Sequence, residues 1–153
     1  MNDHYIVTSD RGHLRIYAET RPPGHRPPRL DVVEALDFPA GRANYSAHDT
    51  DMAGRFPGSG ADGRDGGMSI DERLPMKREE ERRGVRLIAS ELDRFFATRR
   101  EATWDLAIAP SLYNAIVQAL SPATRLRLQR VLSKDLVNQT TDDVQSHFAT
   151  AGR

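Results

Sequence analysis

The stretch Trp104-Asp105-Leu106-Ala107-Ile108-Ala109-Pro110 decides the fold of this chain. It is a short apolar run with one charged residue, Asp105, and it ends at Pro110, which has no N–H to donate to a neighbouring strand. An apolar run of this length that stops at a structure breaker is typical of a buried strand. We therefore expect residues 104–109 to form an interior strand flanked by helices.

A long helix is predicted before this strand, from near residue 75 to about residue 100. Pro75 fits only the first turn of a helix, so the regular helix should begin close to it. The apolar residues that follow recur at intervals of three and four. They define one buried stripe, which consists of Val85, Ile88, Leu92, Phe95 and Phe96.

The residues after the strand predict two helices, another strand and a last helix. A helix over 112–120 is followed by Ser121-Pro122, an N-cap and first-turn pair that starts a second helix. The chain then passes from helix to strand near Arg130. Residues 140–143, Thr-x-x-Asp, resemble a capping box with Asp in place of Glu and open a short helix that ends near residue 149.

The first forty residues predict three strands. Residues 4–8 and 14–19 are rich in β-branched and aromatic residues, and the turn residues between them indicate a β-hairpin. Residues 21–29 hold four prolines and form a connector. A third strand is expected over 30–38, with alternating apolar residues on one face: Leu30, Val32, Leu36 and Phe38.

The predicted element order is β-β-β-α-β-α-α-β-α, within a single domain that spans residues 1–153. Three antiparallel strands followed by alternating helices and strands favour a three-layer α/β fold with a mixed five-stranded sheet. This is a ribonuclease-H-like arrangement. Residues 39–70 interrupt it as a Gly-rich loop. We expect this loop to be mobile, because residues 39–68 hold seven of the 11 glycines and few apolar side chains.

The composition excludes several classes of function. Lys plus Arg and Asp plus Glu each number 22, so the net charge is zero, and the simplest argument for a nucleic-acid or membrane-surface binder is lost. The absence of cysteine excludes disulfides, thiol catalysis and Cys-ligated zinc. The apolar runs are too short to span a membrane and no secretory leader opens the chain, so we expect a soluble cytoplasmic protein.

The sequence predicts neither a cofactor nor a metal site. Gly58-x-Gly60-x-x-Gly63 matches the dinucleotide-binding pattern, but no strand leads directly into it and no helix begins at Gly63. The five histidines never come within four residues of one another, which excludes the usual metal-ligand spacings along the chain.

Two carboxylates are candidates for an acidic site. Ribonuclease-H-like nucleases gather acidic residues around two divalent cations. Asp10 follows the first predicted strand and Glu34 lies on a neighbouring one. A third acid is needed near the carboxyl end of the strand over 104–109, but Asp105 lies at its other end. A metal-dependent nuclease is therefore the third choice, since Asp10 is also explained by turn chemistry.

A basic run on the predicted long helix is the candidate binding surface. It is broken by three consecutive glutamates at 79–81, and such a run is usually a solvated face. As a functional surface it would bind either an RNA backbone or an acidic protein partner. Its members are Lys77, Arg78, Arg82, Arg83 and Arg86.

The sequence also resembles the bacterial family of proteins required for attachment to host cells. The resemblance covers about residues 4–19 and 71–148. Its most specific part is Leu120-Ser121-Pro122-Ala123, followed about a dozen residues later by Lys134-Asp135-Leu136. The strand Trp104–Pro110 and the charged lead-in Arg78–Arg82 also fit. The resemblance implies a small α/β domain related to the middle domain of archaeal and eukaryotic release factors and of Pelota.

That relationship draws attention to Gly66-Gly67-Met68. In release factors a Gly-Gly-Gln tip precedes the long helix, and its glutamine positions water for peptide release. Met68 stands at the corresponding place, and a thioether cannot donate the hydrogen bonds of an amide. The resemblance therefore does not imply peptide release, although these three residues remain candidates for contact with a partner.

From these observations we expect a host-attachment-family protein that acts by binding rather than by catalysis. The alternative is a ribosome- or RNA-associated release-factor-like module without peptide-release activity, and the third is the nuclease. A protein partner or the ribosome is expected, whereas a membrane and a nucleotide cofactor are not.

Overall fold

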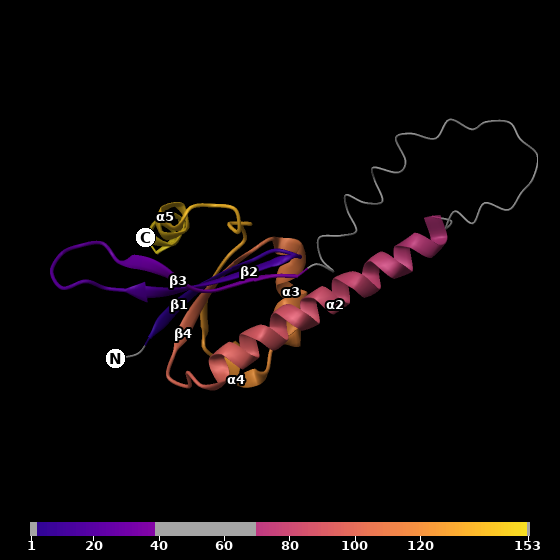
Figure 1. The fold of residues 1–153 in the computed structure, drawn as a ribbon, viewed down its shortest axis with the longest axis horizontal. Coiled ribbons are helices and arrows are strands. Elements are labelled where there is room, and N and C mark those ends of the chain that lie inside the picture. Colours follow the sequence, from indigo (N-terminus) through magenta and orange to yellow (C-terminus); the bar gives the residue numbers. More distant parts are fainter. Residues whose placement is uncertain (1–2, 39–69, 153) are drawn as a thin grey trace, which may run out of the picture.

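The computed structural model describes residues 3–38 and 70–152, which form one five-stranded sheet and four helices (Figure 1). The elements are β1 (His4–Ser9), β2 (His13–Thr20), β3 (Arg29–Asp37), α2 (Ile70–Ala97), β4 (Thr103–Ile108), α3 (Pro110–Ala119), α4 (Pro122–Arg125), β5 (Leu128–Leu132) and α5 (Thr141–Ala151). The predicted mixed α/β class with a mixed five-stranded sheet is confirmed.

The sheet is mixed, with the strand order β3-β2-β1-β4-β5. β2 is antiparallel to both β1 and β3, whereas β4 runs parallel to β1 and to β5. β4 therefore lies inside the sheet, and five of its six residues, Trp104 to Ile108, are buried. The prediction of an interior strand at this stretch is confirmed.

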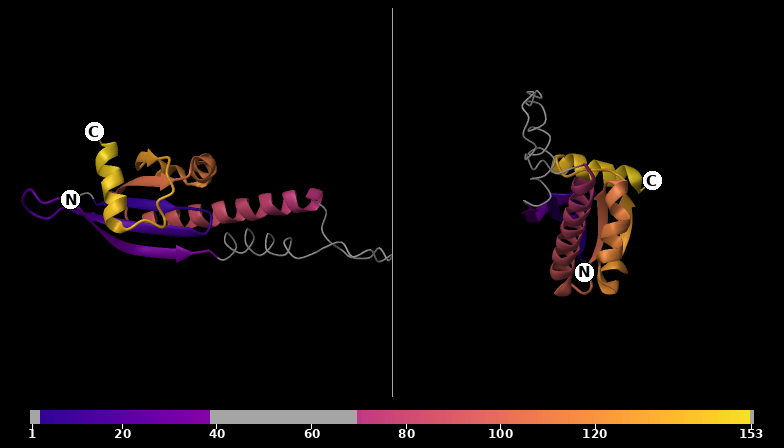
Figure 2. Two further views of the ribbon diagram at one scale, coloured as in Figure 1. Left: turned by 90° about the horizontal axis from the view of Figure 1, so that it is seen from above. Right: turned by 90° about the vertical axis from the view of Figure 1, so that its right-hand side faces the viewer.

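Helices cover both faces of the sheet, since alternate residues of each strand enter two different cores. Val7 and Leu106 belong to the larger core, which α2 and α3 close. Ile6 and Ala107 belong to the smaller core, which α5 closes with Val144 and Phe148 among its buried residues. Figure 2 shows α2 and α3 running beside each other and α5 lying apart from them.

The larger core is built around Trp104. The Trp104 ring stacks on Phe96 at a centroid distance of 5.3 Å, and Tyr5 packs edge-on against Phe96 at 5.9 Å. The indole N–H of Trp104 donates to the backbone carbonyl of Thr124 at 2.9 Å, so the one polar atom of this buried side chain has a partner. The apolar stripe predicted on the long helix thus packs on β4.

β3 differs from the prediction because it contains a β-bulge. Its register with β2 shifts between Ile16 and Tyr17, which lie opposite Glu34 and Val32 respectively. Val33 is the extra residue, and an extra residue reverses the alternation of side chains between the two faces.

The bulge divides the apolar residues of β3 between the two cores. Leu30 packs in the smaller core under α5, whereas Leu36 and Phe38 pack against the larger core. Val32 is 55% exposed. The prediction that all four share one face was therefore wrong.

Several predicted boundaries move. α2 begins at Ile70, so Pro75 is the sixth residue of the helix and lies inside it rather than in its first turn as predicted. The predicted loop over 39–70 therefore loses its last residue to the helix, and the rest of it lies outside the described residues. α3 begins at Pro110, which occupies a first-turn position, and β5 begins at Leu128 rather than near Arg130.

Candidate functional site

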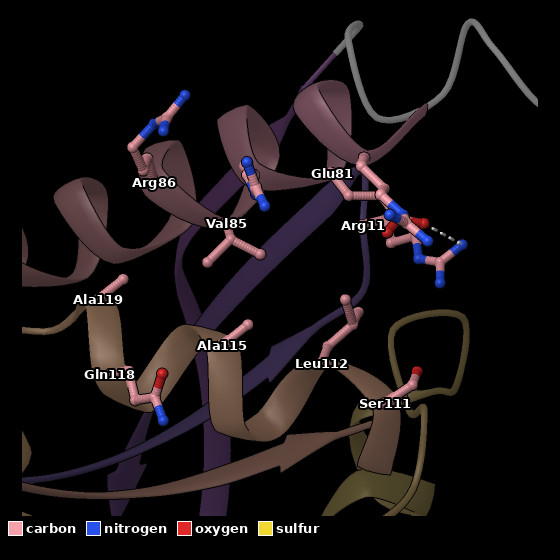
Figure 3. Close-up of a pocket in the computed structure, with 11 residues that line it drawn as sticks. Arg11, Glu81, Val85, Arg86, Ser111, Leu112, Ala115, Gln118 and Ala119 are labelled. Carbon is pink, nitrogen blue, oxygen red and sulfur yellow. Dashed lines mark ion pairs between the residues drawn. The ribbon is translucent and has the colours of Figure 1, made fainter. Parts of the chain in front are cut away.

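A basic groove lies between α2 and α3, next to the β1–β2 turn. Its volume is about 470 Å³. Figure 3 shows the arginines of α2 above the small side chains of α3. The residues that line the groove are Arg11, Arg78, Glu81, Arg82, Val85, Arg86, Ser111, Leu112, Ala115, Gln118 and Ala119.

The arginines share one side of α2 because they recur at every fourth residue. Arg78, Arg82 and Arg86 are spaced i, i+4 and i+8, so their side chains lie one above another along the helix. Arg11, from the β1–β2 turn, adds a fourth guanidinium. Between them the wall is apolar, formed by Val85, Leu112, Ala115 and Ala119.

The groove carries a surplus of positive charge. Four guanidinium groups stand against one carboxylate on its wall, that of Glu81, which pairs with Arg11 at 3.3 Å. Arg86 pairs with Glu79 at 3.0 Å, and both side chains are more than half exposed. An anionic group that enters the groove would therefore meet arginine forks, which bind carboxylates and phosphates in two-point contacts.

At Gly84 the backbone of α2 lies close to the β1–β2 turn. Gly84 is buried, and a Cβ atom added there would meet the backbone carbonyl of Arg11 at 3.5 Å. The helix therefore lies next to the turn, and Arg11 lines the groove together with the arginines of α2.

The structure brings together three of the five predicted basic residues. Arg78, Arg82 and Arg86 line the groove, whereas Lys77 and Arg83 do not. Lys77 is half-buried and Arg83 is exposed to solvent on the same helix. The predicted partner-binding residues Gly66, Gly67 and Met68 lie outside the described residues.

The two predicted acidic-site residues have separate partners. Asp10 accepts hydrogen bonds from the backbone N–H of Gly12 and from the His13 ring, each at 2.8 Å, as expected for a turn residue. Glu34 pairs with Arg94 of α2. Among residues 3–38 and 70–152, no group of three or more His, Asp or Glu side chains is arranged to hold a metal ion.

A network of hydrogen-bonded polar side chains joins β1, β4 and β5, and it was not predicted from the sequence. His4 lies between two partners: its Nδ1 is 2.9 Å from Thr103 Oγ1, and its Nε2 is 3.1 Å from Asp105 Oδ2. Arg130 donates to the same Asp105 oxygen from two nitrogens, at 2.9 and 2.6 Å. The sequence feature that could have indicated it is Asp105 within an apolar strand, because a carboxylate can be buried only if it has polar or charged partners.

The Asp105 carboxyl is ionised despite complete burial. Burial acts to raise its pKa, but the hydrogen bonds from His4 and Arg130 and their positive charges outweigh it and hold the pKa below the ordinary 3.8. An ionised carboxylate only accepts hydrogen bonds. Asp105 therefore fixes the orientation of the His4 ring.

Within the described residues, no helix combines the length and the apolar character needed to cross a bilayer. Among curated proteins, none matches this chain significantly. The family model described as "Protein required for attachment to host cells" matches residues 5–148, which run from the start of β1 into the last helix. The chain therefore belongs to the family of proteins required for attachment to host cells.

Proposed function

We propose that this protein acts by binding, and that the α2–α3 groove receives an acidic segment of a partner protein. The family description points to a role related to attachment. The observation that carries the proposal is the row of arginines at i, i+4 and i+8 over an apolar wall. This combination suits a partner helix that presents carboxylates beside apolar side chains, a common mode of peptide recognition.

The composition of the groove favours a protein segment over RNA. Within the part of the chain that the structure describes, no aromatic side chain lines it, and single-stranded RNA is bound chiefly by stacking of its bases on aromatic rings. Three consecutive glutamates at 79–81 also interrupt the basic residues of α2, which weakens the attraction of a continuous phosphate backbone. The release-factor-like and nuclease alternatives remain predictions without a supporting observation.

The test compares two neighbouring arginines of α2. The probe is a fluorescent helical peptide with Glu and Leu repeated along one face, and its affinity is measured by anisotropy. Arg82→Glu should weaken binding at least tenfold, because Arg82 lines the groove. Arg83→Glu makes the same charge change on an exposed residue outside the groove and should change the affinity less than twofold.

Equal loss in the two variants would remove the groove from the proposal. A single-stranded RNA of uridines serves as the second probe. If this RNA binds more tightly than the acidic peptide, with affinity that falls steeply as salt is added, the RNA-associated alternative replaces the proposed one.

A further inference from the structure

A second hollow lies at the other end of the sheet, away from the α2–α3 groove. Its volume is about 520 Å³. It opens where β1, β4 and β5 begin and where β2 ends, and both His4 and Thr103 line it. The remaining residues on its wall are Asp3, Glu19, Thr20, Arg21 and Gln129.

The hydrogen bonds of His4 determine which of its nitrogens is a base. Asp105 Oδ2 accepts from Arg130 and is ionised, so His4 Nε2 must carry the proton and donate it. In neutral His4 the Nδ1 lone pair then faces Thr103 Oγ1 at 2.9 Å. The Thr103 hydroxyl accordingly donates to a basic nitrogen at the wall of the hollow.

We propose that Thr103 is a base-activated nucleophile that accepts an acyl group from a small carboxylic ester in this hollow. The three groups that nucleophilic catalysis requires are present: a hydroxyl, a histidine base within hydrogen-bond distance of it, and a buried carboxylate that orients the base. Thr103 and His4 are the catalytic residues, and Asp105 and Arg130 are positioning residues. This reactivity is separate from the groove and does not depend on the proposed function.

The reaction balances with water as the only co-reactant. Thr103 Oγ1 attacks the ester carbonyl as its proton moves to His4 Nδ1. The bond between the carbonyl carbon and the leaving oxygen breaks, and the leaving alcohol takes that proton. Water then gives a proton to Nδ1 and attacks the acyl carbon, and Thr103 Oγ1 leaves with the proton.

The wall of the hollow also limits the substrate. Arg21 and Gln129 carry the N–H groups on it that could face a developing oxyanion. The Nε–H of Arg21 donates to Glu19 Oε1 at 2.9 Å, so the terminal N–H groups of Arg21 take no part in that contact. A volume of about 520 Å³ admits an ester of small-molecule size.

The experiment treats the full chain with p-nitrophenyl acetate and follows acetylation of each threonine by mass spectrometry. Thr20 is the internal comparison, because it lines the same hollow but its hydroxyl contacts Asp31 at 3.5 Å instead of a histidine. Thr103 should be acetylated at least about 100-fold faster than Thr20, the lower range for general base catalysis.

His4→Gln should bring Thr103 acetylation down to the rate of Thr20. His147→Gln is the matched control, since it removes an imidazole outside the hollow, and should leave the rate unchanged. If His4→Gln fails to fold, the comparison of Thr103 with Thr20 in the wild-type protein decides. Equal rates at Thr103 and Thr20, or an unchanged rate in folded His4→Gln, would overturn the proposal.

Discussion

At the scale of single residues, Asp105 links the stability of the protein to pH. Its pKa is lowered in the folded state, so the stability that it contributes is present above its ordinary value of 3.8 and is lost as pH falls through the folded pKa. Urea unfolding should therefore show stability falling below about pH 3.8. Asp105→Asn should be less stable than the wild type at pH 7 but lose less of its stability on acidification.

A wild-type pH dependence that Asp105→Asn reproduces in full would contradict this account. It would assign the acid sensitivity to groups other than Asp105.

Gly84 provides a second prediction at this scale. A glycine inside a helix costs about 0.5–1 kcal/mol relative to alanine. A Cβ atom here would meet the Arg11 carbonyl at 3.5 Å, an ordinary van der Waals contact. Gly84→Ala should therefore stabilise the protein by about 0.5–1 kcal/mol in urea unfolding. A loss of stability would show that the turn under α2 cannot accommodate the methyl group.

At the scale of elements, the start of α5 depends on the Thr140 side chain. Thr140 is the N-cap, and its hydroxyl oxygen accepts from the backbone N–H of Asp143 at 3.2 Å. Thr140→Ala should cost about 1 kcal/mol in urea unfolding, because that N–H loses its partner. Thr150→Ala at the exposed end of the same helix is the matched control and should cost less than half as much. Equal costs would mean that the cap does not hold α5.

β3 shows how one element can be recognised and still be misplaced. Its apolar residues were correctly predicted to form a strand, but the bulge at Val33 sends Leu30 to one core and Leu36 to the other. A bulge also bends the strand and twists it, which hinders pairing of this sheet edge with another chain.

At the scale of the whole molecule, β4 couples the two cores. Leu106 packs in one and Ala107 in the other, so neither core can open without disturbing the same strand. By contrast, α2 extends past the sheet at its beginning, where Leu74 and Met76 are about half exposed (Figure 1). Local stability should differ accordingly along the chain.

Hydrogen exchange measures this difference. The backbone amides of residues 104–108 should exchange only through global unfolding, more slowly than those of the other helices and strands. The amides of residues 74–80 should exchange fastest within α2. Protection over 74–80 equal to that of β4 would show that the projecting part of α2 is packed against something in solution.

The helices and strands of this protein follow from short stretches of its sequence, because periodicity and capping are local properties. The apolar run at Trp104, the stripe on α2 and the Ser121 and Thr140 caps all depend on residues within a few turns of one another. The repeat of Arg78, Arg82 and Arg86 was likewise readable as one helix face.

Only the tertiary structure decided which surfaces those elements share. The groove needs α3 beside α2. His4 meets Thr103 and Asp105, which are 99 and 101 residues further along the chain, only because β1 and β4 pair in parallel. The position of the β3 bulge is equally a matter of pairing. The pairing register depends on contacts between strands that are distant in the sequence, so the spacing of residues along one strand does not determine it.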